Sequence, residues 1–326
     1  MSTTTSRMAR ILVGALTLGL SAAAPAAAAN VKITPLGSHD GEFCQFDRAM
    51  IFEDPDGTRL LYDPGRTVAG PRDERLGKVD AVLITHMHGD HVGDRHIARV
   101  NAGACDKVEV PHPATPDTNA VNIALEKKAL IVSGSEMPQF FAGKLAARGG
   151  DPSASQLVRF GASRQVGGVA ITTVPAVHSN GIAGAMVGGD LGHLLDSAGL
   201  TAYAGPATGF VLTFSNGLVV YLSGDTGITA EQDTVVRGHY GARLAVINIG
   251  DTFTTGPTEA AYVINELVQP AAVIPSHANE AATKNGRVIA GTRTARFMEA
   301  VKVPVHLPLS GRTMAFDASG RCVSGC

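Results

Sequence analysis

Three histidines and one aspartate lie close together in one short segment of this chain. Residues 86–91 read HMHGDH and contain His86, His88, Asp90 and His91. The preceding residues 79–85 are apolar and β-branched, which predicts a buried strand. Imidazole nitrogen and carboxylate oxygen bind Zn²⁺, Mn²⁺ and Fe ions, and a loop fixed by a rigid strand can aim several of them at one point. The sequence therefore predicts a metal site just past the end of this strand.

Other predicted strands also end in an ionisable side chain. The strands predicted at 58–62, 169–177, 218–222, 244–249 and 271–275 are followed by Asp63, His178, Asp225, Asp251 and His277. Ligands in open α/β folds bind outside the carboxyl ends of the strands. We therefore expect these strand ends to converge. This position makes His178 a stronger candidate for a metal ligand than a lone histidine elsewhere in the chain.

Two of these motifs resemble a known family. Residues 86–91 resemble the H-x-H-x-D-H signature of the metallo-β-lactamase superfamily, and Gly224-Asp225-Thr226-Gly227 resembles its bridging-aspartate motif. The resemblance extends over about residues 31–310 and implies an α/β (α+β) fold, the four-layer αββα sandwich. The stretches 224–227, 249–257 and 274–277 look similar to the branch of ascorbate-6-phosphate-lactonase-like and uncharacterised metal-dependent hydrolases.

The resemblance also implies which residues bind metal. Two divalent metal ions are implied, with Zn²⁺ as the first choice and Mn²⁺ or Fe as alternatives. The first ion would be held by His86, His88 and His178, the second by Asp90, His91 and His277, and Asp225 would bridge them. Asp63 matches a residue that supports the metal loop without binding metal. Asp90 and Asp225 are the expected catalytic residues.

This ligand set implies hydrolysis of a small-molecule substrate. Two divalent ions can share a hydroxide that attacks an ester, lactone or phosphoester, so no Ser or Cys nucleophile is needed. One alternative is a β-lactam or acyl-homoserine-lactone hydrolase, although Asp225 stands where true β-lactamases commonly have Cys. Another alternative, of a different class, is a non-catalytic metal-binding protein that has kept the fold.

The N-terminus has the pattern of an export signal. Arg7 and Arg10 precede an apolar stretch at 11–20, and small residues lead to Ala29, where we expect cleavage. Residues 1–29 are thus predicted to be a signal peptide, and 30–326 a single domain in the periplasm or outside the cell. No later stretch has the length of a membrane span, and a net charge of −2 gives no indication of nucleic-acid binding. The oligomeric state is left open.

Four cysteines are compatible with disulfides in an exported chain. Cys44, Cys105, Cys322 and Cys326 allow three pairings. We favour Cys44 with Cys105 and Cys322 with Cys326. Free thiols are the alternative.

Three further segments carry structural expectations. We expect a helix at about 94–100 after the metal loop, and two helices in residues 115–161, either as a pocket-shaping insertion or as packing on the outer face of a sheet. The Gly-rich residues 181–209 predict a flexible loop over the site. Of the remaining histidines, His39 is the one most expected to approach the pocket, whereas His193 is expected to be solvated.

Overall fold

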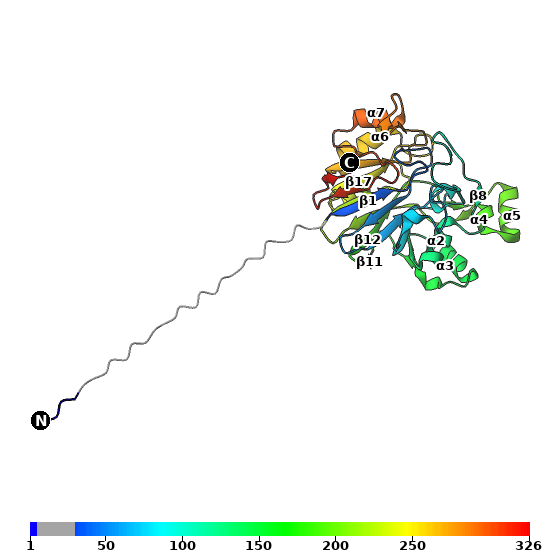
Figure 1. The fold of residues 1–326 in the computed structure, drawn as a ribbon. Helices are drawn as coiled ribbons and strands as arrows, with labels where there is room; N and C mark the ends of the chain where they lie inside the picture. Colours follow the sequence, from blue (N-terminus) through cyan, green and yellow to red (C-terminus); the bar gives the residue numbers. More distant parts are fainter. Residues whose placement is uncertain (5–29) are drawn as a thin grey trace.

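Two β-sheets lie face to face in the computed structural model, which describes residues 1–4 and 30–326 (Figure 1). The first sheet has eight strands in the order β10-β9-β4-β3-β2-β1-β21-β22. Their bounds are β1 (Val31–Pro35), β2 (Met50–Glu53), β3 (Arg59–Tyr62), β4 (Ala81–Ile84), β9 (Leu130–Ser133), β10 (Ser155–Leu157), β21 (Met314–Phe316) and β22 (Cys322–Ser324).

The second sheet has six strands in the order β11-β12-β15-β16-β17-β18. Their bounds are β11 (Ser163–Val166), β12 (Val169–Pro175), β15 (Thr208–Thr213), β16 (Val219–Leu222), β17 (Leu244–Asn248) and β18 (Ala272–Ser276). Strands β16, β17 and β18 run parallel, so their carboxyl ends lie at one edge of the sheet. In the first sheet β3, β4 and β9 are parallel in the same way.

The core between the sheets follows from alternating side chains. In β1, Val31 and Ile33 are buried between the sheets, whereas Lys32 is exposed. Phe52 of β2 stacks on Phe214, which follows β15, with ring centroids 6.4 Å apart. This alternation is what one buried face of a strand requires.

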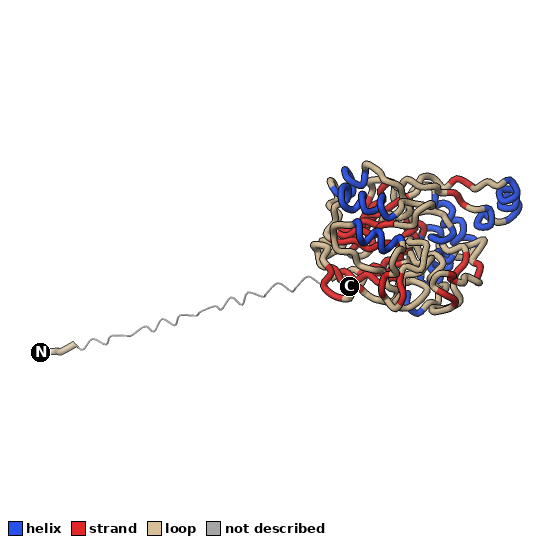
Figure 2. Tube along the Cα trace, turned by 90° about the horizontal axis from the view of Figure 1, so that it is seen from above, coloured by secondary structure: helices blue, strands red, loops and turns tan. Residues whose placement is uncertain are grey.

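Helices cover the outer faces of both sheets. Helices α2 (Asn119–Lys127) and α3 (Met137–Ala147) contribute to the apolar cluster on the first sheet. On the second sheet, α6 (Pro257–Tyr262) and α7 (Arg293–Ala300) do the same, and α6 continues into a π-helical stretch at Val263–Val268. Figure 1 places the two helical pairs on opposite sides of the strands, and Figure 2 shows the strands in the middle from above. The four-layer αββα sandwich predicted from the sequence is confirmed.

The remaining elements are short. They are the α-helices α1 (Gly89–Val92), α4 (Gly184–Val187) and α5 (Gly189–Ala198), 3-10 turns at Glu74–Leu76 and Pro152–Ala154, a π-helical turn at Gln232–Arg237, and the paired strands β5 (Arg95–His96) with β8 (His112–Pro113), β6 (Gly103–Ala104) with β7 (Lys107–Val108), β13 (Gly181–Ile182) with β14 (Ala202–Tyr203), and β19 (Thr283–Lys284) with β20 (Arg287–Val288).

The helix expected at 94–100 is not formed. Helix α1 ends at Gly93, whose left-handed φ of 76° turns the chain away, and the Gly93 N–H donates to Gly89 O. Asp94 then accepts two hydrogen bonds from the guanidinium of Arg66. The chain continues as β5, which pairs with β8, so the expectation that His96 lies on a helix is wrong.

Residues 181–209 are more ordered than expected. They contain α4 and α5 within the β13–β14 pair, and both views show this helical pair at the outer edge of the molecule (Figures 1 and 2). A Cβ on Gly192 would lie 2.4 Å from Gly184 O, so glycine is needed where the two helices touch. The glycines that suggested a loop instead permit close helix packing.

Residues 115–161 contain the two expected helices, and also strands β9 and β10, which the sequence did not predict. Because β9 pairs with β4 in the middle of the first sheet, this segment is integral to the sheet. Its helices pack on the outer face of that sheet, the second of the two expectations for this segment.

Both favoured disulfides are present, Cys44–Cys105 and Cys322–Cys326. The predicted signal peptide falls largely on residues 5–29, which lie outside the described part of the chain. Within the described part, no helix combines the length and apolar character that a bilayer crossing requires.

Candidate metal centre

The structure brings all seven predicted ligands together at the carboxyl ends of the strands. They follow β4, β12, β16 and β18, and their side-chain nitrogen and oxygen atoms form three overlapping groups, each within 4.8 Å. These groups are His86, His88 and His178; His86, His91 and Asp225; and Asp90, His91 and His277. We call His86, His88 and His178 the first half of the centre and Asp90, His91 and His277 the second half.

The first half directs three imidazole nitrogens at one another. His88 Nδ1 lies 3.0 Å from His86 Nε2 and 3.2 Å from His178 Nε2. Thr85 Oγ1 donates to Asp63 Oδ2 and therefore accepts from His86 Nδ1, 3.0 Å away. Since a neutral imidazole carries one proton, the Nε2 of His86 is left with its lone pair facing the centre.

Burial keeps the first half uncharged. It lowers the pKa of His86 well below its usual value, and the nearby imidazole of His91 adds to this effect. Burial, followed by the neighbouring imidazoles of His178 and His91, lowers the pKa of His88 to about 4. Burial also lowers the pKa of His178. At neutral pH these rings are uncharged, so each has one nitrogen lone pair that can coordinate a cation.

Asp225 lies between the halves. Its Oδ2 is 3.9 Å from His86 Nε2, 3.7 Å from His178 Nε2, 3.4 Å from His91 Nε2 and 3.0 Å from His277 Nε2. Burial alone would raise its pKa, but the imidazoles of His277 and His91 hold the pKa of Asp225 well below the ordinary value. The ionised carboxylate therefore lies between the imidazoles of the two halves.

The second half depends on Asp63 for its geometry. His91 Nδ1 donates to Asp63 Oδ2 over 2.8 Å, which directs His91 Nε2 at the centre. Asp63 also binds Thr85 and thereby orients His86, so one buried carboxylate supports both halves. Asp63 and His277 have positive φ values of 36° and 51°, and non-glycine residues hold this conformation mainly at functional sites. The predicted supporting role of Asp63 agrees with these contacts.

The second half is charged. Burial opposes ionisation of His91, yet the carboxylates of Asp225, Asp63 and Asp90 raise the pKa of His91 to about 10. Burial would likewise raise the pKa of Asp90, but the guanidinium of Arg48 and the imidazole of His91 hold it well below the ordinary value. The two halves of one centre thus differ in protonation.

Several residues that hold the site belong to no sequence motif. Arg48 Nη2 lies 2.7 Å from Asp90 Oδ2 and 2.7 Å from His277 Nε2, and donates to Asn279 Oδ1 over 2.9 Å. Asn180 Oδ1 accepts from the Met87 N–H over 2.8 Å. A single Arg or Asn in a loop belongs to no spacing pattern, so these contacts emerge only from the fold.

A cavity of about 620 Å³ opens onto the centre. It is lined by five of the proposed ligands, the guanidinium groups of Arg48, Arg66 and Arg293, and the rings of Phe46 and Phe253. Phe253 is largely exposed at this wall, next to two residues with positive φ, Asp251 and Thr252. The wall combines basic and aromatic side chains around one face of the proposed metal ligands.

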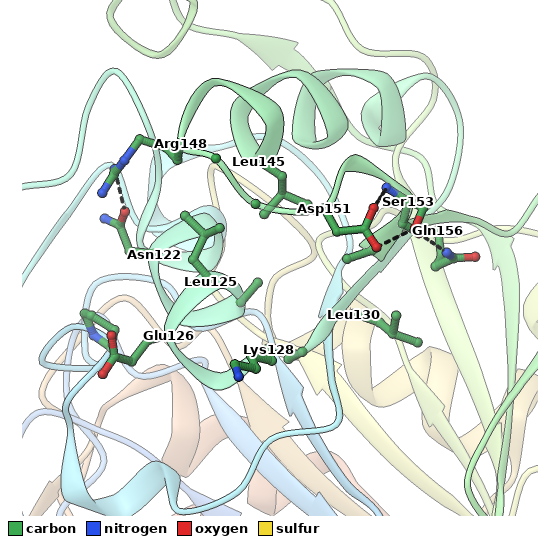
Figure 3. A pocket seen from close by; sticks show the side chains of 16 residues that line it. Asn122, Leu125, Glu126, Lys128, Leu130, Leu145, Arg148, Asp151, Ser153 and Gln156 are labelled. Atoms are coloured by element: carbon green, nitrogen blue, oxygen red, sulfur yellow. Dashed lines mark hydrogen bonds between the residues drawn. The ribbon is translucent and has the colours of Figure 1, made fainter.

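A larger cavity of about 990 Å³ lies elsewhere, between α2, α3 and the start of β9 (Figure 3). Its polar groups bond one another: Arg148 donates to Asn122, and Ser153 donates to Asp151. None of the proposed ligands lines it. Although this cavity is the larger of the two, the converging imidazoles identify the smaller cavity as the candidate functional site.

Other sequence candidates lie outside the centre. Asp251 follows β17, but its side chain is exposed and lines neither cavity. His39 contacts Ser38 and Gly103 O and does not line the cavity at the centre. His193 lies on α5, exposed as expected.

The donor set fits divalent cations. It contains five imidazoles and two carboxylates, without thiolate. Asp225 Oδ1 is buried without a hydrogen-bond partner, as expected for an oxygen whose partner is a cation. A sandwich with His and Asp ligands at the strand ends defines the class of metal-dependent αββα proteins.

Comparison with known families agrees with this class. The family model described as the beta-lactamase superfamily domain matches residues 58–278. The chain belongs to this superfamily.

Relatives and solved structures point the same way. The chain is 31% identical to a UPF0173 metal-dependent hydrolase of Koribacter versatilis over 226 residues, covering 68% of this chain and 77% of the relative. A second UPF0173 metal-dependent hydrolase, from Pelotomaculum thermopropionicum, is also 31% identical, with the same coverages. A metallo hydrolase from Ignicoccus hospitalis has the same fold, with a TM-score of 0.56, 22% identity, and coverage of 88% of this chain and 99% of that chain.

Proposed function

We propose that this chain is an exported metal-dependent hydrolase that cleaves an ester, lactone or phosphoester bond of a small molecule at a centre for two divalent ions. The observation that carries the proposal is that His88 Nδ1 lies 3.0 Å from His86 Nε2 and 3.2 Å from His178 Nε2, where His86 is buried, the other two rings are partly buried, and the pKa values of all three are lowered. The relatives named metal-dependent hydrolases support the reaction class.

The proposed roles follow from the contacts. His86, His88 and His178 would hold one ion; Asp90, His91 and His277 would hold the other, with Asp225 between them. Zn²⁺ suits this set best, and Mn²⁺ or Fe also fits. Bound divalent ions lower the pKa of water and polarise the oxygen of the scissile group.

The protein's own groups would orient the reactants. Asp90 lines the cavity and is ionised at neutral pH, so its carboxylate can accept a hydrogen bond from the attacking water and fix its direction. Asp63 holds the His91 ring by a direct hydrogen bond and the His86 ring through Thr85. Arg66 and Arg293 in the cavity wall favour a substrate with a polar or anionic group.

Export is supported by two features. The charged start followed by the apolar stretch at 11–20 and small residues up to Ala29 has the pattern of a cleaved signal. Two disulfides suit an oxidising compartment. Expression of the full chain in a bacterium, followed by cell fractionation and mass spectrometry, should give a periplasmic or secreted protein that begins at Asn30. An intact N-terminus in the cytoplasmic fraction would contradict export.

The central test is elemental analysis of the purified protein beside two matched variants, Asp225→Asn and Asp251→Asn. Hydrolysis of a lactone, an ester, a phosphodiester, a β-lactam and an acyl-homoserine lactone is assayed on the same samples. Both aspartates follow a parallel strand, but only Asp225 lies in the centre. We expect metal and activity in the wild type and in Asp251→Asn, and loss of both in Asp225→Asn.

The outcomes separate the alternatives. Turnover of the β-lactam or the acyl-homoserine lactone alone would favour the second candidate. Bound metal without turnover of any substrate would favour a metal-binding protein that has kept the fold. No metal above background, even after refolding with Zn²⁺ or Mn²⁺, would refute the metal centre.

A further inference from the structure

Arg48 reaches into the second half of the centre from the loop before β2. Its side chain is only 3% exposed. A single atom, Nη2, makes its contacts with Asp90 Oδ2 and His277 Nε2, at 2.7 Å each, and with Asn279 Oδ1 at 2.9 Å. Asp90 and His277 are two of the three residues of the second half, so the guanidinium binds the same atoms that a cation would use.

The contact between Arg48 and His277 excludes a metal ion from the same nitrogen atom. Arginine keeps its protons in proteins and has no acceptor, so when the His277 ring is neutral, Nη2 donates and His277 Nε2, which also lies 3.0 Å from Asp225 Oδ2, accepts with its lone pair. That nitrogen has one lone pair, which can accept a hydrogen bond or coordinate a metal ion, but not both. Asp90 Oδ2, by comparison, has lone pairs for two partners. Coordination by His277 therefore requires the guanidinium to leave its position.

The first half has no such competitor. Within the described part of the chain, no lysine or arginine forms an ion pair or hydrogen bond with His86, His88 or His178. The nearest partners of their inward-facing nitrogens are one another and the Asp225 carboxylate. A cation that enters the first half displaces no positive side chain.

We infer that Arg48 is a built-in cation that competes with the second metal ion for Asp90 and His277. The inference deepens the proposed function and rests on it, because it presupposes a metal ion in the first half. One ion then binds tightly there, and the second binds only when the guanidinium turns away. Arg48 lines the cavity, so in the single-ion form its guanidinium is the second positive charge that faces the substrate.

The surroundings of Arg48 allow this exchange. The backbone before it is fixed, since Asp47 accepts from the N–H groups of Ser38 and Cys44 and Cys44 is bonded to Cys105. The guanidinium is held less firmly, because Nε and Nη1 are buried without a hydrogen-bond partner. These two unpaired nitrogens carry three N–H donors and make the inward position costly, and a second ion has to break only the bonds made by Nη2.

The test is a titration of the metal-free mature protein with Zn²⁺ in the presence of a competing chelator. In the wild type we expect one tight equivalent and a second at least about tenfold weaker. In Arg48→Met, which keeps an unbranched apolar side chain and removes the charge, the second equivalent should tighten by roughly ten- to a hundredfold, the usual range for groups that contact metal ligands. The first equivalent should stay within about threefold.

Two further variants control the result. Arg66→Gln removes a positive charge from the same cavity, but Arg66 pairs with Asp94 rather than with a proposed ligand, so both equivalents should remain as in the wild type. Asn279→Ala keeps the guanidinium and removes one of its anchors, so the second equivalent should tighten by about threefold.

The failures are distinguishable. Two equally tight equivalents in the wild type, or an unchanged second equivalent in Arg48→Met, would overturn the competition and leave the proposed hydrolase standing. Absence of any Zn²⁺ binding would overturn the proposed function itself. If Arg48→Met does not fold by circular dichroism, the stepwise wild-type titration and Asn279→Ala decide the question in the same way.

Discussion

The first and second halves of the metal centre begin in the same six-residue loop but differ in charge. Burial and neighbouring imidazoles lower the pKa values of His86 and His88, whereas His91 faces three carboxylates that raise its pKa to about 10. Arg48 adds a permanent positive charge to the second half alone. The comparison teaches that ligand spacing does not set metal affinity, because the neighbouring side chains decide which positions stand ready for a cation.

The largest effect is expected when one imidazole is deleted from each half in turn, in two separate variants. His178→Ala should remove the tightly bound ion and lower kcat/KM by at least about a thousandfold, or roughly 4 kcal/mol of transition-state stabilisation. His277→Ala should have a smaller effect, because the tight ion and Arg48 remain. Zinc content and kcat/KM of both variants check this prediction. The comparison fails if His277→Ala loses all zinc while His178→Ala keeps it.

A smaller effect is expected for substitution of Asp63, which supports both halves of the centre. Asp63→Asn should weaken metal binding in both halves by roughly ten- to a hundredfold, since it releases His91 and the Thr85 link to His86. Thr85→Val breaks only the link to His86 and should weaken the first half alone. Stepwise zinc titration of the two variants measures the difference. Equal losses in both steps for Thr85→Val would show that the halves are not supported separately.

The pH dependence of the metal-free protein should reflect both halves. The lowered pKa values of His86, His88 and His178 destabilise the fold as pH falls from about 6.5 towards 4, because the unfolded chain then binds more protons. The raised pKa of His91 contributes stability that is full below about pH 6.5 and is lost as pH rises towards 10.

Thermal unfolding of EDTA-treated protein between pH 4.5 and 10 should therefore show a maximum near pH 6.5. His91→Gln should flatten the alkaline side only. A monotonic curve in the wild type would contradict the opposite protonation of the two halves.

The smallest effect expected is at Ser179. Its Oγ lies 3.3 Å from His88 Nε2 at an exposed position, so Ser179→Ala should change the first zinc affinity by less than about threefold, within the range of one weak hydrogen bond. The same titration measures it. A tenfold loss would mean that the first half depends on outside support as strongly as the second half depends on Asp63.

Much of the centre could be predicted from local patterns. Each proposed ligand lies in or just after a segment whose apolar, β-branched residues predict a strand, and the HMHGDH loop alone contains four of them. Prediction failed where local composition pointed the wrong way. The glycines of 181–209 indicated a loop, yet they are where α4 and α5 touch. Strand β9 was missed because an apolar run of four residues between two helices has no period of its own.

The sequence by itself indicated the sandwich class and the seven candidate ligands, through short motifs that resemble the metallo-β-lactamase superfamily, because such motifs are local properties of the chain. Its four cysteines left three disulfide pairings open, and the favoured one is present. Only the tertiary structure decided that Arg48 lies within the centre. This depends on contacts between residues far apart in the chain, such as Arg48 with His277. The charge difference between the halves arises in the same way, since a pKa is set by burial and by neighbours that only the fold brings together.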